Sequence, residues 1–141
     1  MNDFFTKFQR FAVLGLSRNP NSFSRKACSF LASQGCEVFP VNPSADNIDG
    51  RTCYTIESLP EVQAAIFFTN PRVTSKLLPS LKSKGIVHAW FQRGSADQTV
   101  IKEAQELGIS YKNSCLFMHH PNASFPHRFH GGILRLFNLD N

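Results

Sequence analysis

The sequence has no long apolar segment. Its longest apolar runs, such as Phe11 to Leu16, are far shorter than the roughly 20 residues of a membrane-spanning helix, so we expect no membrane partner. Residues Met1 to Phe5 also lack the basic start and long apolar stretch of a secretory signal peptide. The chain has four cysteines without any C-x-x-C pair: Cys28, Cys36, Cys53 and Cys115. Such cysteines are typical of reduced thiols, and together these absences predict a cytoplasmic protein.

Charged residues are also few, at 18% of the 141 residues, while apolar residues make up 42%. This composition is typical of one globular domain with its own core. The 15 basic and 10 acidic residues give a net charge of +5, which favours an anionic partner without identifying one. The aromatic residues follow core spacing and are not interleaved with basic residues, so we expect no nucleic-acid partner.

Short apolar runs alternate with segments of helical periodicity. We expect strands at residues 11–14, 36–41, 64–68, 86–91 and 109–112. A helix should begin near Phe23, and another should follow the Asn70-Pro71 cap. Pro79 lies inside that second helix and predicts either a kink or two short helices. The sequence from Ser95 to Gln98 fits a capping box for a third helix, and Phe4, Phe8 and Phe11 indicate a helix at the N-terminus.

This alternation predicts an α/β fold with a doubly wound, mainly parallel five-stranded sheet flanked by helices. We expect residues 1–122 to form the domain. Residues 123–141 should form a C-terminal helical tail that packs on the domain or mediates a homodimer. In such sheets ligands bind beyond the carboxyl ends of the strands, where the strand order reverses.

The first of these loops, from Gly15 to Ser22, combines a tight turn with a helix N-terminus, which suits a phosphate group. It lacks the second and third glycines of the dinucleotide fingerprint. The second strand ends in Val41-Asn42-Pro43 without a carboxylate for a ribose hydroxyl, so NAD is disfavoured. The basic residues Arg18, Arg25 and Lys26 either serve a phosphate or form a solvated surface.

From this loop onward the sequence resembles the small stand-alone CoA-binding domain family. The resemblance covers roughly residues 8–118 and rests on an ordered succession of short motifs. These motifs are Phe11 to Ser17, Asn19-Pro20, Ser24, Lys26, Val38 to Pro43, Gly50, Tyr54, Ser58 to Pro60, Trp90 to Gly94 and Asn113 to Cys115. The family is similar to the CoA-binding domain of the succinyl-CoA synthetase alpha subunit. The resemblance therefore implies a Rossmann-like fold and coenzyme A or an acyl-CoA as ligand.

The resemblance also implies a set of ligand-binding residues. The phosphates would contact Gly15, Leu16, Ser17, Arg18, Ser24 and Lys26. The adenosine end would lie beside Val41, Asn42 and Pro43, and the pantetheine arm beside Thr69, Asn70, Pro71, Gln92, Arg93 and Gly94. The chain departs from the family pattern at two places. Arg25 and Lys26 stand where a tyrosine and an arginine are usual, and Thr69-Asn70 are neutral where arginines are frequent.

The expected function is therefore CoA or acyl-CoA binding by a non-catalytic binding or regulatory module. The catalytic phosphohistidine of the synthetase lies in a domain that we expect this chain to lack. Two alternatives stay open: a small nucleotide-dependent, oxidoreductase-like enzyme using the same crevice, and an assembly subunit with a vestigial site.

Two further groups of residues could carry chemistry. The histidines His119, His120, His127 and His130 either ligate a metal or border an amphipathic helix, and we expect no metal. Cys115 follows the fifth predicted strand, next to the expected crevice. It is a nucleophile, a partner for the CoA thiol in a mixed disulfide, or a small buried residue.

Overall fold

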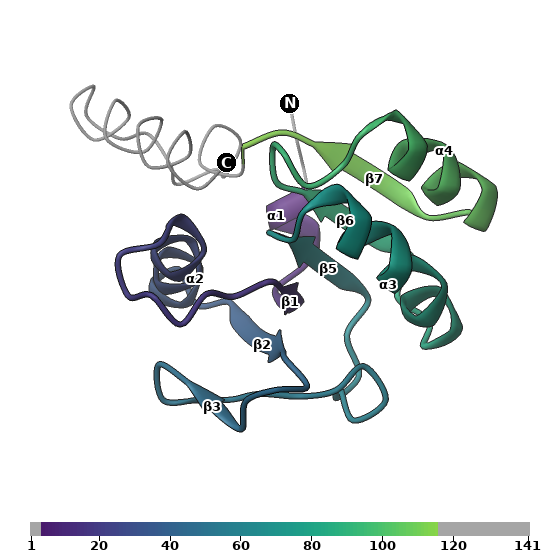
Figure 1. The fold of residues 1–141 in the computed structure, drawn as a ribbon. Coiled ribbons are helices and arrows are strands. Elements are labelled where there is room, and N and C mark those ends of the chain that lie inside the picture. The colour runs from purple at the N-terminus through teal and green to yellow at the C-terminus, as the bar shows by residue number, and fades with distance from the viewer. Residues whose placement is uncertain (1–3, 116–141) are drawn as a thin grey trace.

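The computed structural model describes residues 4–115, which form a doubly wound α/β domain (Figure 1). Its sheet has five parallel strands in the order β2-β1-β5-β6-β7. The strands span Arg10–Leu14 (β1), Glu37–Val41 (β2), Ala64–Phe67 (β5), His88–Phe91 (β6) and Ser110–Asn113 (β7). All five predicted strands are confirmed, and the fold is Rossmann-like as expected.

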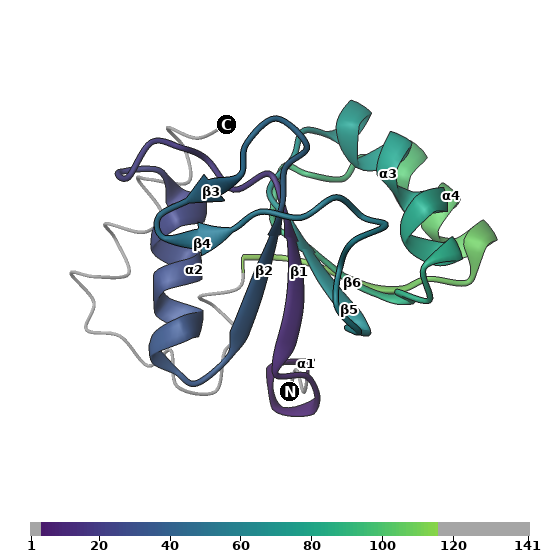
Figure 2. The same cartoon turned by 90° about the horizontal axis from the view of Figure 1, so that it is seen from below.

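Helices cover both faces of the sheet, with α2 on one side and α3 and α4 on the other (Figures 1 and 2). The helices are α1 (Phe4–Lys7), α2 (Phe23–Ser33), α3 (Pro71–Ser83) and α4 (Gln98–Leu107). Alternate residues of β1 serve the two faces: Ala12 and Leu14 pack with the α3 and α4 side, whereas Phe11 packs with α2. Because both faces of the central strands are buried, β1 and β5 are almost continuously apolar.

The short N-terminal helix α1 packs its aromatic side chains into the core. Phe4 and Phe5 are buried against Phe11 and Trp90, with ring centroids 4.9–5.7 Å apart. Each fully buried phenylalanine side chain contributes about 1.5–3 kcal/mol to folding. The prediction that Phe11 belongs to this helix is wrong, because α1 ends at Lys7 and Phe11 lies in β1.

The structure settles the two alternatives at Pro79 and corrects the predicted cap of α4. Pro79 lies within a single helix, α3, where Leu78 and Leu81 are buried on either side of it. Their packing on the sheet offsets the hydrogen bond that a proline cannot donate. Helix α4 is capped by Asp97 and not by Ser95, because the Asp97 Oδ1 accepts a hydrogen bond from the Val100 amide at 3.0 Å.

The predicted loop after β2 contains a small antiparallel hairpin, β3 (Asn47–Ile48) and β4 (Arg51–Thr52). Asp49 and Gly50 connect its strands with φ angles of 58° and 75°. Asp-Gly is a strong signal for this type of turn. The hairpin lies beside α2 in Figure 2.

The chain after the hairpin lines the outer edge of β2. The Tyr54 amide donates to the Pro40 carbonyl at 2.8 Å, and the Asn42 amide donates to the Tyr54 carbonyl at 2.9 Å. Pro40, inside β2, has no N–H of its own to donate on this edge.

Within residues 4–115, no helix is long and apolar enough to cross a membrane. The expected tail at residues 123–141 lies outside the described residues, and so do His119, His120, His127 and His130.

Candidate functional site

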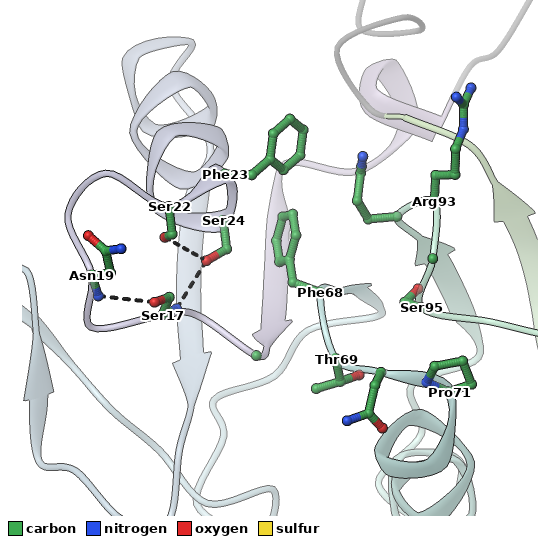
Figure 3. A pocket seen from close by; sticks show the side chains of 14 residues that line it. Ser17, Asn19, Ser22, Phe23, Ser24, Phe68, Thr69, Pro71, Arg93 and Ser95 are labelled. Carbon is green, nitrogen blue, oxygen red and sulfur yellow. Dashed lines mark hydrogen bonds between the residues drawn. The ribbon is translucent and has the colours of Figure 1, made fainter. Parts of the chain in front are cut away.

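A cavity of about 440 Å³ lies at the carboxyl end of the sheet, where the strand order reverses between β1 and β5 (Figure 3). This volume is in the range of small-molecule sites, and the switch point of a doubly wound sheet is where ligands bind. The loops after β1, β5 and β6 line it, through Gly15, Ser17, Asn19, Ser22, Phe23, Ser24, Phe68, Thr69, Asn70, Pro71, Gln92, Arg93, Gly94 and Ser95.

Gly15 lets the loops after β1 and β5 approach each other at the floor of the cavity. Its φ of +92° belongs to a region that other residues rarely adopt. A Cβ atom at this position would also lie 2.9 Å from both the Thr69 amide nitrogen and the Thr69 Cγ2. The glycine is therefore required by backbone packing as well as by the turn.

The first loop is held against the start of α2 by hydroxyl groups. The Ser17 amide donates to the Ser24 Oγ at 3.0 Å, and the Asn19 amide donates to the Ser17 Oγ at 3.0 Å. Ser22 caps α2 by accepting from the Arg25 amide at 3.3 Å. The first turn of α2 thereby faces the cavity with the positive end of the helix dipole.

Ser22 and Ser24 together leave one hydroxyl proton for a ligand. Both side chains are buried, each accepts from a backbone amide, and their Oγ atoms are 3.2 Å apart. One hydroxyl donates to the other, so the second retains its own proton, and both residues line the cavity. This arrangement suits a ligand with acceptor oxygens, such as a phosphate.

The loop after β5 has a different set of polar groups. The Asn70 Oδ1 accepts from the Val73 amide at 3.0 Å and caps α3. The Thr69 Oγ1 lies 2.6 Å from the Thr74 Oγ1, which in turn lies 3.0 Å from the Asn70 carbonyl oxygen. Thr74 is fully buried beneath this loop.

The loop after β6 is a tight turn from Gln92 to Ser95. The Ser95 amide donates to the Gln92 carbonyl at 2.9 Å, and Gly94 has a φ of 94°. Ser95 is 2% exposed, and its Oγ has no hydrogen-bond partner among the described residues. The sequence places Ser95 in a loop at the ligand-binding end of the sheet, but its capping-box pattern kept it out of the predicted ligand-binding residues.

The three cations expected near the phosphate, Arg18, Arg25 and Lys26, lie outside the cavity lining. The Arg18 guanidinium donates to the Ser44 carbonyl at 3.0 Å. Arg25 donates to the Arg18 carbonyl and pairs with Asp49 of the hairpin, both at 3.0 Å. The hydrogen bond from Arg51 and the nearby Arg25 hold the pKa of Asp49 below its ordinary value. Lys26 lies in a separate hollow formed with Pro20, Arg25, Ser29 and Asp49. Arg93, which the resemblance places beside the pantetheine arm, does line the cavity.

The predicted ligand-binding residues divide accordingly into two groups. The cavity brings together Gly15, Ser17, Ser24, Thr69, Asn70, Pro71, Gln92 and Gly94. Leu16 and Val41 are buried in the core. Asn42 and Pro43 lie on the loop after β2, where the Asn42 Oδ1 accepts from the Ser44 amide at 2.8 Å. The adenosine contacts that the resemblance implies would therefore lie outside the cavity itself.

All four cysteines are free thiols. Cys115 is 1% exposed and packs in the aromatic cluster with Phe4 and Trp90, and it does not line the cavity. Burial raises the pKa of the Cys28 thiol to about 12. Within the described part of the chain, no group of three or more His, Cys, Asp or Glu side chains could hold a metal ion.

The fold and cavity define a Rossmann-like domain with a polar site at its switch point. A model of the CoA binding domain matches residues 9–121, and the chain belongs to this family. The uncharacterized protein YneT of Bacillus subtilis is 28% identical over 104 residues, which are 71% of this chain and 76% of that protein.

Two solved structures of similar size share the fold. A conserved hypothetical protein from Pyrococcus furiosus is 31% identical with a TM-score of 0.70, over 77% of this chain and 93% of that one. A hypothetical protein from Pyrococcus horikoshii is 27% identical with a TM-score of 0.76, over 84% and 85% of the two chains.

Proposed function

We propose that the protein binds coenzyme A or an acyl-CoA thioester in the switch-point cavity, as a binding or regulatory module without catalysis. The observation that carries this proposal is the first turn of α2, which faces the cavity with a buried hydroxyl pair. Membership of the CoA-binding domain family supports CoA in particular as the ligand.

The charge of the cavity supports an anionic ligand. Among the described residues that line it, Arg93 is the one charged side chain. A diphosphate placed against the start of α2 would meet the helix dipole and a hydroxyl donor. NAD is less well matched, because β2 is followed by Asn42 and Pro43 where a carboxylate would bind the ribose.

The hydrogen bonds of the first loop support binding over catalysis. The hydroxyls of Ser17, Ser22 and Ser24 contact backbone amides or each other. A serine nucleophile would instead need a general base beside it.

A cytoplasmic location is part of the proposal, and the four free thiols fit a reducing compartment. The tail from residue 123 onward is proposed to pack on the domain or to join a homodimer, which sedimentation of the full-length protein would test.

Titration calorimetry with CoA, acetyl-CoA and NAD tests the ligand. We expect heat with CoA or acetyl-CoA and none with NAD. Native mass spectrometry of the gently purified protein would show the same ligand as a mass increment.

Arg93→Gln should weaken CoA binding about tenfold, since it removes a charged donor from the cavity. The matched control is Arg72→Gln, because Arg72 is exposed on α3 and does not line the cavity. No binding of CoA or acetyl-CoA at millimolar concentration would overturn the proposal.

A further inference from the structure

The proton of the Thr69 hydroxyl is committed to the protein. The Thr74 Oγ1 is within hydrogen-bond distance of both the Asn70 carbonyl oxygen and the Thr69 Oγ1. A hydroxyl has one proton, so both contacts are hydrogen bonds only if Thr74 donates to the carbonyl and Thr69 donates to Thr74. The Thr69 Oγ1 then offers only lone pairs to a ligand.

Ser95 offers the complementary group. Its hydroxyl is buried in the wall of the cavity and has no partner among the described residues. Buried hydroxyls in folded proteins almost always have a partner, so an unpartnered one in a cavity wall points to a ligand. Because Ser95 keeps its proton, it can donate to an acceptor atom of that ligand.

Thr69 and Ser95 lie on neighbouring loops and away from the serines of the first loop. Their loops follow β5 and β6, which pair in parallel up to Phe67 and Phe91. Figure 3 shows Thr69 and Ser95 on one side of the cavity and Ser17, Ser22 and Ser24 on the other, with Phe68 between the two sides. The lone pairs of Thr69 would repel a phosphate oxygen, so the immediate surroundings of Thr69 suit an uncharged part of the ligand.

We propose that Thr69 and Ser95 form an amide-recognition pair, in which the Thr69 Oγ1 accepts from the N–H and the Ser95 Oγ donates to the C=O of a ligand amide. The inference rests on the proposed function, since the pantetheine arm of CoA contains two secondary amides. It assigns specificity to Ser95, and it gives the neutral Thr69 a role of its own at a position where arginine is frequent in the family.

The test compares CoA with adenosine 3′-phosphate 5′-diphosphate, which has the same phosphates and lacks the pantetheine arm. Titration calorimetry is carried out on wild type, Thr69→Val and Ser95→Ala. Each substitution should weaken CoA binding about tenfold, the loss of one hydrogen bond, and leave the truncated ligand unchanged. Thr69→Ser keeps the acceptor and should retain CoA binding. Ser80→Ala, on the exposed side of α3, is the matched control.

Thermal unfolding separates recognition from a structural role. Ser95→Ala removes a buried hydroxyl that has no partner in the free protein, so its melting temperature should not fall. If the variants weaken both ligands equally, or leave CoA binding intact, the amide pair is wrong while the proposed function stands. If wild type binds neither ligand, the proposed function fails and the amide pair with it.

Discussion

The two sides of the cavity differ in how their polar groups are used before any ligand arrives. On the α2 side, the hydroxyls of Ser17, Ser22 and Ser24 are bonded to backbone amides or to each other. On the β5 and β6 side, the Ser95 hydroxyl is buried without a partner among the described residues. The hydroxyls of the α2 side are held by hydrogen bonds within the protein, whereas the Ser95 hydroxyl would gain a partner only from a bound group. Under the proposed function, the α2 side would bind the phosphates and the β5 and β6 side would recognise one part of the ligand.

The largest expected effect comes from the contact that joins the two sides. Gly15→Ala would place a Cβ atom 2.9 Å from the Thr69 backbone at a φ of +92°. We expect the free energy of unfolding to fall by about 3 kcal/mol or more, from strain and overpacking together. Urea denaturation measures the change.

Gly35→Ala is the control for backbone strain alone. Gly35 has a similar φ of +88°, and a Cβ atom there would have no neighbour within 4 Å. Its cost should be about 1–2 kcal/mol. Equal losses of stability in the two variants would contradict a close approach of the loops after β1 and β5.

The next effect concerns the α2 side. Ser24→Ala removes the acceptor of the Ser17 amide and one member of the hydroxyl pair. We expect stability to fall by about 1 kcal/mol and CoA binding to weaken about tenfold. Both CoA and its truncated form should be affected, in contrast to the Ser95 variant. Ser33→Ala, at the exposed far end of α2, should change neither quantity.

The last effect appears only at high pH, beneath the first loop. Cys28 packs with Leu16 in the core, and burial raises the pKa of its thiol from 9.0 to about 12. Because the folded state holds the proton more tightly, this contribution to stability is complete below pH 9 and is lost as the pH rises towards 12.

The limiting slope for one thiol in this range is about 1.4 kcal/mol per pH unit. Urea unfolding between pH 8 and pH 10.5 should therefore show a steeper loss in wild type than in Cys28→Ala. Parallel losses in the two proteins would show that another group is responsible.

The fold was largely predictable because the buried strands are short apolar runs between well-marked helix caps. Ser22, Asn70 and Asp97 cap their helices through hydrogen bonds that involve only neighbouring residues. Such local interactions leave a clear pattern in a sequence. The β3–β4 hairpin was missed because strands of two residues have no periodicity, although Asp49-Gly50 marked the turn.

The site was less predictable because it depends on strand order. Sequence alternation implies parallel strands, but it does not show that β1 lies between β2 and β5. That order brings the loops after β1, β5 and β6 around one cavity, whereas Asn42 and Pro43, after β2, do not line it. The burial of Ser95 is likewise a product of packing between loops, and no local pattern marks it.

The covered edge of β2 has a consequence for how copies of this chain can meet. An exposed strand edge is a template for pairing with another chain, and many proteins aggregate through such edges. Here the Tyr54 segment already occupies the carbonyl of Pro40 and the amide of Asn42, and Pro40 itself offers no donor. A foreign strand therefore finds no continuous ladder at this end of β2. Self-association along this edge is opposed by the covalent chemistry of one proline and by two hydrogen bonds.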